Sequence, residues 1–209
     1  MRGAIILAGG PSRRLRRPKA LVEIGGVPLV MRVVAIAGEV AEEVVIVSRG
    51  EVAAEIQRSL PLARVVRDRS RVQSPLVGLL AGAAALRSKY VVALPCDLPF
   101  VQPALLRRLF AAAEGRNAAI PRWPDGRIEP LVAVYERKPM SLAARAALGA
   151  GERSNHSMIE RLGDVGYVDV ARFRSADPHL VSFVNVNTPA DLARARRMAT
   201  RFARPPRTR

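Results

Sequence analysis

The chain of 209 residues contains a single cysteine, Cys96, and aromatic residues make up only 4% of it. One cysteine cannot form a disulfide within the chain or a cysteine-based zinc cluster, which agrees with a reducing compartment. Hydrophobic residues still account for 49% of the sequence. We therefore expect a substantial core built from Ala, Val, Leu and Ile rather than from aromatic side chains.

The sequence also has no apolar run close to the roughly 20 residues that a membrane-spanning helix needs, and no signal-peptide pattern at its amino terminus. We therefore expect a cytoplasmic protein that makes no membrane contact. No linker rich in Gly, Ser or Pro divides the chain. This predicts one domain over residues 1–200, followed by a basic, disordered tail over residues 201–209.

Acidic residues are scarce, because 18 Asp and Glu stand against 34 Lys and Arg, and the formal net charge is +16. The sequence has no zinc finger, aromatic RNA-binding signature or helix-turn-helix pattern to accompany this charge, so we do not expect nucleic acid as the partner. An anionic small substrate explains the charge equally well. A non-catalytic basic protein that binds nucleotide or nucleic acid is the alternative that charge alone favours.

Apolar runs typical of strands alternate with helical segments along the first half of the chain. Strands are expected at 3–8, 44–47, 65–66 and 91–94, and helices at 28–37, 51–59 and 76–86. This alternation predicts an α/β fold with a mostly parallel central sheet and helices on both faces. In the second half we expect a hairpin with strands at 118–121 and 128–135, helices at 140–148 and near Met158, a strand at 165–170, and a last helix from Pro189 capped by Thr188.

The most distinctive stretch covers residues 3–19, where an apolar run meets Gly9 and Gly10 and then a basic loop that contains Arg13 and Lys19. Two glycines after a strand expose backbone N–H groups, and the cations beside them predict a polyphosphate ligand. A tight turn next to a solvated arginine face is the alternative interpretation. Neither a Walker loop nor a dinucleotide fingerprint fits, because Lys19 precedes Ala20 and the two glycines are adjacent.

Lysine is rare in this chain, since Lys19, Lys89 and Lys138 are the only lysines among its 34 basic residues. A compact ammonium suits a phosphate oxygen as a point charge, whereas a guanidinium prefers a two-pronged contact. This difference favours a specific role for Lys19.

Two aspartates follow strands at the edge where parallel sheets bind ligands. Asp97 lies in the rigid segment 95–99, where it either holds Mg²⁺ against nucleotide phosphates or caps a turn. Asp68 follows the strand at 65–66, and it either accepts hydrogen bonds from a base or ribose or pairs with the arginines around it, which are Arg67, Arg69 and Arg71.

Five segments occur together in the order found in one family. They are LAGG at 7–10 leading to Lys19, SPLVG at 74–78, LPCDLP at 94–99, EPL at 129–131 with Tyr135, and FVNVNTP at 183–189. The chain resembles the molybdenum cofactor guanylyltransferases (MobA-type), within the nucleotidyltransferases of Rossmann-like fold. The resemblance covers nearly all of residues 3–198 and implies a single-domain Rossmann-like nucleotidyltransferase fold.

The resemblance implies transfer of GMP from GTP to the phosphate of molybdenum-bound molybdopterin, with Mg²⁺ and release of pyrophosphate. It implies nucleotide contacts for Leu7, Ala8, Gly9, Gly10, Lys19, Ser48 and Asp68, a metal-binding role for Asp97, catalytic roles for Lys19, Asp97 and Arg13, and acceptor contacts for Asn185 and Asn187. Ser48 stands where the family often has asparagine. The alternatives within this chemistry are CTP in place of GTP, or another acceptor such as a sugar phosphate or cobinamide phosphate. Transient contact with cofactor-insertion proteins or molybdoenzymes is a further implied partnership.

Overall fold

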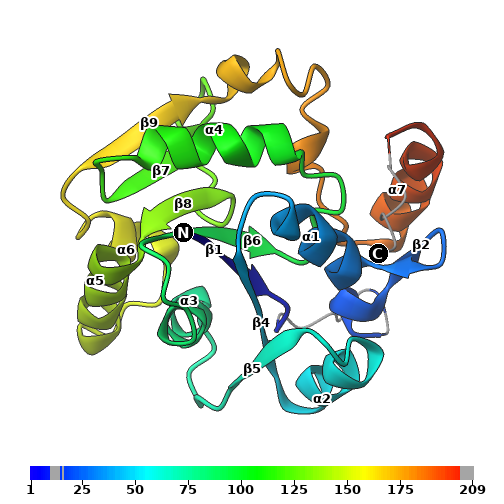
Figure 1. Cartoon of the computed structure of the whole chain (residues 1–209), viewed down its shortest axis with the longest axis horizontal. Helices are drawn as coiled ribbons and strands as arrows, with labels where there is room; N and C mark the ends of the chain where they lie inside the picture. The colour runs from blue at the N-terminus through cyan, green and yellow to red at the C-terminus, as the bar shows by residue number, and fades with distance from the viewer. Residues whose placement is uncertain (10–14, 16, 203–209) are drawn as a thin grey trace.

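The first strand of the chain lies in the middle of a seven-stranded sheet, with the strand order β5-β4-β1-β6-β8-β7-β9 (Figure 1). The computed structural model describes residues 1–9, 15 and 17–202. The strands are β1 (Arg2–Leu7), β4 (Glu43–Arg49), β5 (Arg64–Asp68), β6 (Tyr90–Pro95), β7 (Ala118–Arg122), β8 (Ala133–Glu136) and β9 (Val165–Asp169). β1 is an almost continuous apolar run because both faces of a central parallel strand are buried.

Most neighbouring strands of the sheet are parallel, as predicted. β1 pairs in parallel with β4 and β6, β4 pairs in parallel with β5, and β7 pairs in parallel with β9. β8 runs antiparallel to both of its neighbours, β6 and β7. The carboxyl ends of β1, β4, β5 and β6 therefore meet at one edge of the sheet.

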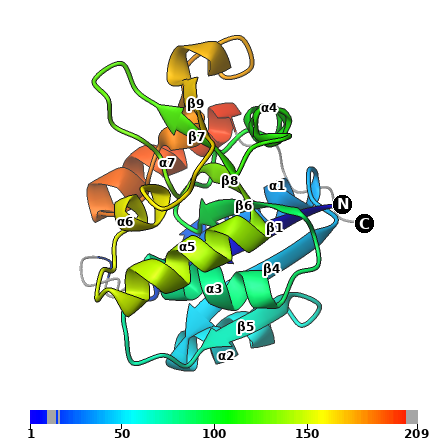
Figure 2. The same cartoon turned by 90° about the vertical axis from the view of Figure 1, so that its left-hand side faces the viewer.

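Helices cover both faces of the sheet, which confirms the expected single-domain α/β class. Ala4 and Ile6 of β1 belong to the apolar cluster that includes α1 (Leu29–Gly38), α2 (Gly50–Ser59) and α4 (Pro103–Ala113). Ile5 faces the opposite way, into the cluster that includes α3 (Pro75–Ala84), α5 (Arg137–Gly149) and α6 (Asn155–Ile159). Figure 2 shows α3 and α5 side by side on this second face.

α4 is not among the helices expected from the sequence, although its signals are present. Pro103 occupies the first turn, and the buried residues Leu105, Leu106, Leu109, Phe110 and Ala113 follow helical spacing. α4 therefore joins α1 and α2 on one face of the sheet.

The predicted hairpin forms, but its second strand is shorter than the expected 128–135. Ile128 makes only an isolated bridge to Arg122, and the Val132 N–H donates to the Glu129 carbonyl at 3.0 Å, which turns the chain. Pro130 lies inside this turn and has no N–H to donate to a ladder. β8 consequently begins at Ala133.

A third apolar cluster joins segments that are far apart in the sequence. It contains Val22, Ile24, Phe100 and Val186, and it packs together β2 (Glu23–Ile24), η3 (Val181–Phe183) and α7 (Pro189–Phe202). Val22 directly follows η1 (Lys19–Leu21). β2 pairs with β3 (Val27–Pro28) around a tight turn in which Gly25 and Gly26 have positive φ angles of 58° and 74°. Figure 1 shows α7 beside this hairpin. The cluster thereby holds the residue that follows η1 next to the chain that leads into α7.

The remaining short helix is η2 (Val170–Phe173), which follows β9 directly. α7 runs to Phe202, two residues into the segment predicted as a tail, and residues 203–209 lie outside the described residues. Within the described part of the chain, no helix is long and apolar enough to cross a bilayer.

Candidate active site

The carboxyl ends of β1, β4, β5 and β6 border a pocket of about 300 Å³. Seven residues predicted from the sequence line it, namely Leu7, Ala8, Gly9, Lys19, Ser48, Asp68 and Asp97. Gly10 and Arg13 lie outside the described residues. Residues that the sequence analysis did not assign to the site, including Arg49, Gln73 and Ser74, complete the described lining.

The turn after β1 is held by the strands on both sides of it. The Ala8 N–H donates to the Val47 carbonyl at 2.8 Å, and the Cys96 N–H donates to the Leu7 carbonyl at 3.0 Å. The buried Ser48 hydroxyl donates to the Ala8 carbonyl at 3.1 Å. The Ser48 hydroxyl hydrogen thus holds the turn. The lone pairs of the same oxygen can accept a hydrogen bond from a ligand in the pocket.

Lys19 connects three segments at the mouth of the pocket. Its Nζ donates to Oδ2 of Asp97 at 2.9 Å and to Oδ1 of Asn187 at 2.5 Å. The side chains of Lys19 and Asp97 are only 20% and 14% exposed. The Val186 N–H also donates to the Asp97 carbonyl, at 3.0 Å. The cation and the carboxylate predicted for phosphate chemistry are therefore in direct contact.

The chain that carries Asn187 is fixed by the start of α7. The Asp191 carboxylate accepts hydrogen bonds from the N–H groups of Asn187 at 3.1 Å and Thr188 at 2.9 Å, and the Thr188 hydroxyl accepts from the Asp191 N–H at 3.1 Å. The bonds from the Thr188 side chain and then the Asn187 backbone lower the pKa of Asp191. This arrangement confirms Thr188 as the helix cap. Asn185 is exposed and lies outside the described pocket lining.

Asp68 lines the pocket and is also ion-paired, so the predicted ion pair forms, but with a different partner. Its partner is Arg49, whose Nε lies 3.3 Å from Oδ2 of Asp68, and not Arg67, Arg69 or Arg71 as the sequence analysis supposed. Oδ1 of Asp68 accepts the Ser70 N–H at 2.8 Å. The sequence signal for Arg49 is its place directly after Ser48, at the end of a strand that leads to the pocket.

The described residues contain no group of three or more His, Cys, Asp or Glu side chains that could hold a metal ion by themselves. Mg²⁺ at phosphate-transfer sites typically takes one or two carboxylates and completes its shell with substrate phosphates and water. Asp97 supplies one such carboxylate, part-buried at the pocket edge. The donor set therefore fits Mg²⁺ that arrives with a nucleotide.

Cys96 lies between Pro95 and Asp97 but is unsuited to nucleophilic chemistry. Burial, followed by the neighbouring Asp97 carboxylate, raises the pKa of the Cys96 thiol to about 12. The thiol is therefore neutral near pH 7, and the thiolate is the nucleophilic form.

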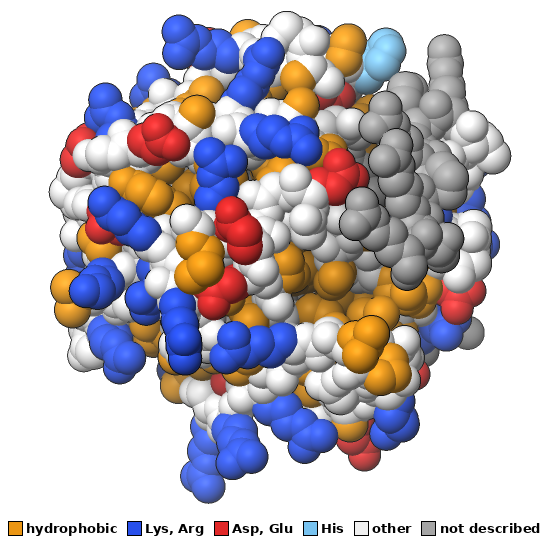
Figure 3. All heavy atoms as spheres, viewed as in Figure 1, with side chains coloured by type: hydrophobic (Ala, Val, Ile, Leu, Met, Phe, Trp, Pro, Cys, Tyr) orange, Lys and Arg blue, Asp and Glu red, His pale blue; other side chains and the backbone are white. Residues whose placement is uncertain are grey.

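The surface charge does not concentrate at one place on the face shown in Figure 3. Lys and Arg side chains are spread over this face, with Asp and Glu side chains between them. A single basic tract of the kind that follows a nucleic-acid backbone is not present among the residues described on this face.

Comparison with known proteins places this chain in a recognised family. Residues 4–165 match the profile of the MobA-like NTP transferase domain. A protein of Methanosarcina mazei described as a probable molybdenum cofactor guanylyltransferase is 34% identical over 203 residues, which cover 91% of this chain and 88% of that protein. The molybdenum cofactor guanylyltransferase of Cereibacter sphaeroides is 36% identical over 197 residues, covering 91% and 93%. The crystal structure of molybdopterin-guanine dinucleotide biosynthesis protein A from Archaeoglobus fulgidus superposes with a TM-score of 0.82 at 30% identity, covering 95% and 98%.

Proposed function

The chain belongs to the family of MobA-like NTP transferases, and from this premise we propose that it transfers GMP from GTP to the terminal phosphate of molybdenum-bound molybdopterin. The observation that carries the proposal is the contact between Lys19 and Asp97 at the edge of a pocket formed by four parallel strands. A cation and a carboxylate fixed at 2.9 Å are the two charges that a nucleotide triphosphate and its metal ion require. The names of the relatives supply the guanylyl group and the molybdenum cofactor, and that of the similar solved structure supplies molybdopterin and guanine.

In the proposed reaction, an oxygen of the acceptor phosphate attacks the α-phosphorus of GTP. The bond from that phosphorus to the bridging oxygen of pyrophosphate breaks, and pyrophosphate leaves with the electron pair. No covalent intermediate with the protein forms, so the work of this chain is to position two anions and to neutralise their charge.

Each part of the pocket has a role in this proposal. The backbone of Leu7, Ala8 and Gly9 would meet the nucleotide, Ser48 would contact it as well, and Asp68 would meet its base or ribose. All five residues line the pocket. Lys19 binds a phosphate oxygen, and Asn187, which contacts Lys19, lies on the acceptor side together with Asn185. From the sequence, Gly10 and Arg13 are assigned to the same phosphate loop.

Asp97 would hold Mg²⁺, which withdraws charge from the reacting phosphate when it is bound. Asp97 is suited to this role because its carboxylate already faces the Lys19 ammonium that the phosphates would also meet. The ion pair orients the carboxylate before the nucleotide arrives.

Release of pyrophosphate tests the proposal. The purified chain, GTP, Mg²⁺ and molybdenum-loaded molybdopterin should give pyrophosphate together with a guanine dinucleotide product, and omission of either molybdopterin or Mg²⁺ should stop both. Binding of GTP without any pyrophosphate release in the complete mixture would instead support the non-catalytic alternative.

The product of this reaction is a cofactor that other enzymes carry. Transient contact with cofactor-insertion proteins or with molybdoenzymes, in the cytoplasm, is therefore part of the same proposal.

A further inference from the structure

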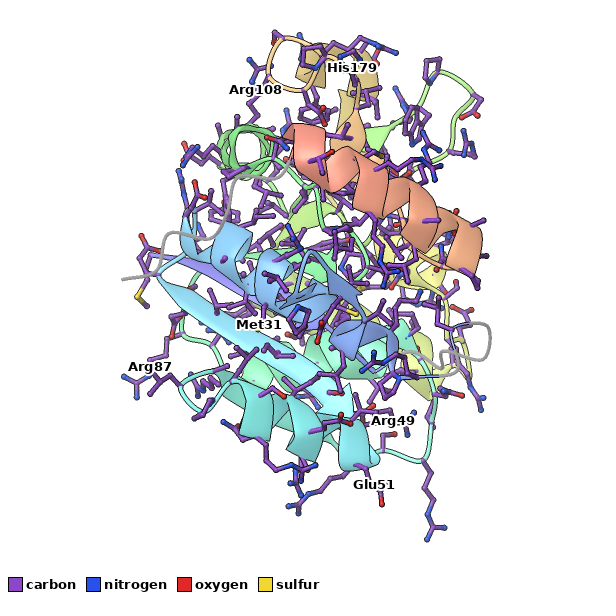
Figure 4. All side chains as sticks on the ribbon, turned by 90° about the vertical axis from the view of Figure 1, so that its right-hand side faces the viewer. Met31, Arg49, Glu51, Arg87, Arg108 and His179 are labelled. Carbon is purple, nitrogen blue, oxygen red and sulfur yellow. The ribbon has the colours of Figure 1, made fainter. Side chains whose placement is uncertain are left out.

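Arg49 is a charged side chain at the pocket that the proposed reaction leaves without a role. It is the last residue of β4, and in the parallel pairing of β4 with β5 it lies opposite Asp68. Figure 4 shows Arg49 where β4 meets α2, with Arg87 at the other end of the sheet. The backbone register therefore brings Arg49 and Asp68 together on the pocket edge, although 18 residues separate them in the sequence.

The guanidinium of Arg49 holds the loop after β5 in two places. Its Nε lies 3.3 Å from Oδ2 of Asp68, and one Nη donates to the Ser70 carbonyl. The Ser70 N–H in turn donates to Oδ1 of Asp68 at 2.8 Å. Both oxygens of the Asp68 carboxylate are thus oriented by Arg49 and Ser70.

Because Asp68 and Arg49 are largely buried, loss of their contact should be energetically costly. The side chain of Asp68 is only 7% exposed, and that of Arg49 is 27% exposed. A carboxylate removed from water in this way depends on a nearby cation, and loss of the cation leaves an uncompensated charge. Because Asp68 also lines the pocket, its orientation decides which lone pairs a ligand meets.

The aliphatic part of Arg49 contacts a second wall of the pocket. A Cβ built on Gly9 would lie 3.2 Å from Cγ and 3.6 Å from Cδ of Arg49, so the arginine stem packs closely against the turn after β1. The Arg49 side chain therefore contacts two parts of the proposed nucleotide site. One is the turn whose backbone is proposed to meet the nucleotide, and the other is the Asp68 carboxylate, which is proposed to meet the base or ribose.

We propose that Arg49 is a positioning residue for the nucleotide, which sets the orientation of Asp68 and its spacing from the Gly9 turn. This inference rests on the proposed function, since it takes a nucleoside triphosphate as the ligand. Lysine cannot take over the role, because the planar fork of arginine donates in two fixed directions and the lysine ammonium is a single point.

The experiment measures binding of GTP with Mg²⁺ by titration calorimetry, without an acceptor. Arg49→Met keeps an unbranched stem against Gly9 and removes the guanidinium, and we expect it to weaken GTP binding at least about tenfold, as for loss of hydrogen bonds to a charged group. Arg49→Lys should recover only part of this loss. The matched control is Arg67→Met, since Arg67 is exposed, precedes Asp68 directly and carries the same charge; we expect a change of less than about twofold, as for a surface charge.

A double-mutant cycle with Asp68→Asn separates positioning from folding. Arg49→Met alone should lower the melting temperature, and the double variant should recover it, because Asp68→Asn removes the uncompensated charge. GTP binding should stay weak in the double variant, and the two single effects should not multiply, because both act through one carboxylate.

Four results would overturn the inference. Arg49→Met that binds GTP as well as Arg67→Met, or losses from Arg49→Met and Asp68→Asn that multiply, would show that Arg49 does not act through Asp68. If Arg49→Met reduced kcat in steady-state transfer but left the KM for GTP unchanged, a role in nucleotide positioning would be contradicted. Wild-type protein that failed to bind GTP would refute the proposed function and this inference with it. If the wild-type protein binds GTP, the difference in GTP affinity between Arg49→Met and Arg67→Met tests the role of Arg49 separately.

Discussion

The two halves of the sheet contribute to the pocket in very different ways. β1, β4, β5 and β6 are parallel, and all four end at the pocket. The other half contains β7, β8 and β9, and β8 runs antiparallel to both of its neighbours. Among the described residues that line the pocket, Leu131 alone comes from the part of the chain after residue 100. The proposed nucleotide end of the site is therefore built into the sheet itself.

The second half reaches the site through a peripheral segment instead of a strand end. Asn187 contacts Lys19 from the chain before α7, where Asp191 and the third apolar cluster hold it. The comparison indicates that changes in the first half should impair nucleotide chemistry broadly, while changes in the second half should act mainly on the acceptor. The following variants test this division.

We expect the largest effect from Asp97→Asn, which keeps the size of the side chain and removes its charge. The loss of transfer activity should be at least about 10²-fold, in the range for removal of one electrostatic stabiliser. Rates measured over a series of Mg²⁺ concentrations provide the check. A variant with near wild-type activity and an unchanged Mg²⁺ dependence would remove the metal role from Asp97.

Lys19 should follow, because it contacts both halves of the site. Lys19→Ala should reduce transfer by about 10²-fold. Lys19→Arg should remain about tenfold below wild type, since a guanidinium cannot occupy the place of the ammonium between two acceptors and small misplacements are costly. Assays at two salt concentrations distinguish this from a general charge effect, in which Lys19→Arg would be harmless.

Asn187→Ala probes the second half, and Asn185→Ala is its neighbour for comparison. Because the Asn187 side chain accepts from the Lys19 ammonium, its loss should lower kcat and raise the KM for the acceptor, together by about tenfold. Asn185→Ala should affect only the KM for the acceptor. Equal effects of both variants on kcat would show that the contact with Lys19 contributes nothing.

Gly82→Ala should have the smallest effect on activity and act on stability instead. A Cβ at Gly82 would lie 2.5 Å from Cγ2 of the buried Ile5, so α3 could not keep its distance from β1. We expect a loss of about 1–3 kcal/mol in the free energy of unfolding, as for overpacking of a core. Gly149→Ala is the control, since a Cβ there meets nothing within 4 Å. Chemical denaturation of both variants would show whether their stabilities differ.

The first half of the fold was predictable from the sequence because buried parallel strands are short, almost continuous apolar runs. β1, β4 and β6 stand out in this way, and Lys19, Asp68 and Asp97 follow from their places after such runs or after the glycine pair. The helix α4 was missed although its apolar spacing is regular. The antiparallel β8 was placed too early because Ile128 continues the apolar pattern while Pro130 interrupts the ladder.

Contacts across the sheet could not be predicted from one sequence. The pairing of Arg49 with Asp68 depends on the register of β4 against β5, and the contact of Lys19 with Asn187 joins residues 168 positions apart. The sequence supplied the residue types for a phosphate site, and the fold determines which of them meet. Arg49 is the clearest example, since its place at the end of a strand marks it for the pocket edge but does not show that it pairs with Asp68.

The most direct test of this account is a competition between two nucleotides. The chain would be incubated with molybdenum-loaded molybdopterin, Mg²⁺ and equal concentrations of GTP and CTP, and the dinucleotide products would be quantified by mass spectrometry. The account predicts that the guanine dinucleotide exceeds the cytosine dinucleotide by at least about 10²-fold, as for a site that hydrogen-bonds one base and leaves polar groups unpaired with the other. Equal amounts of the two products, or an excess of the cytosine dinucleotide, would contradict it.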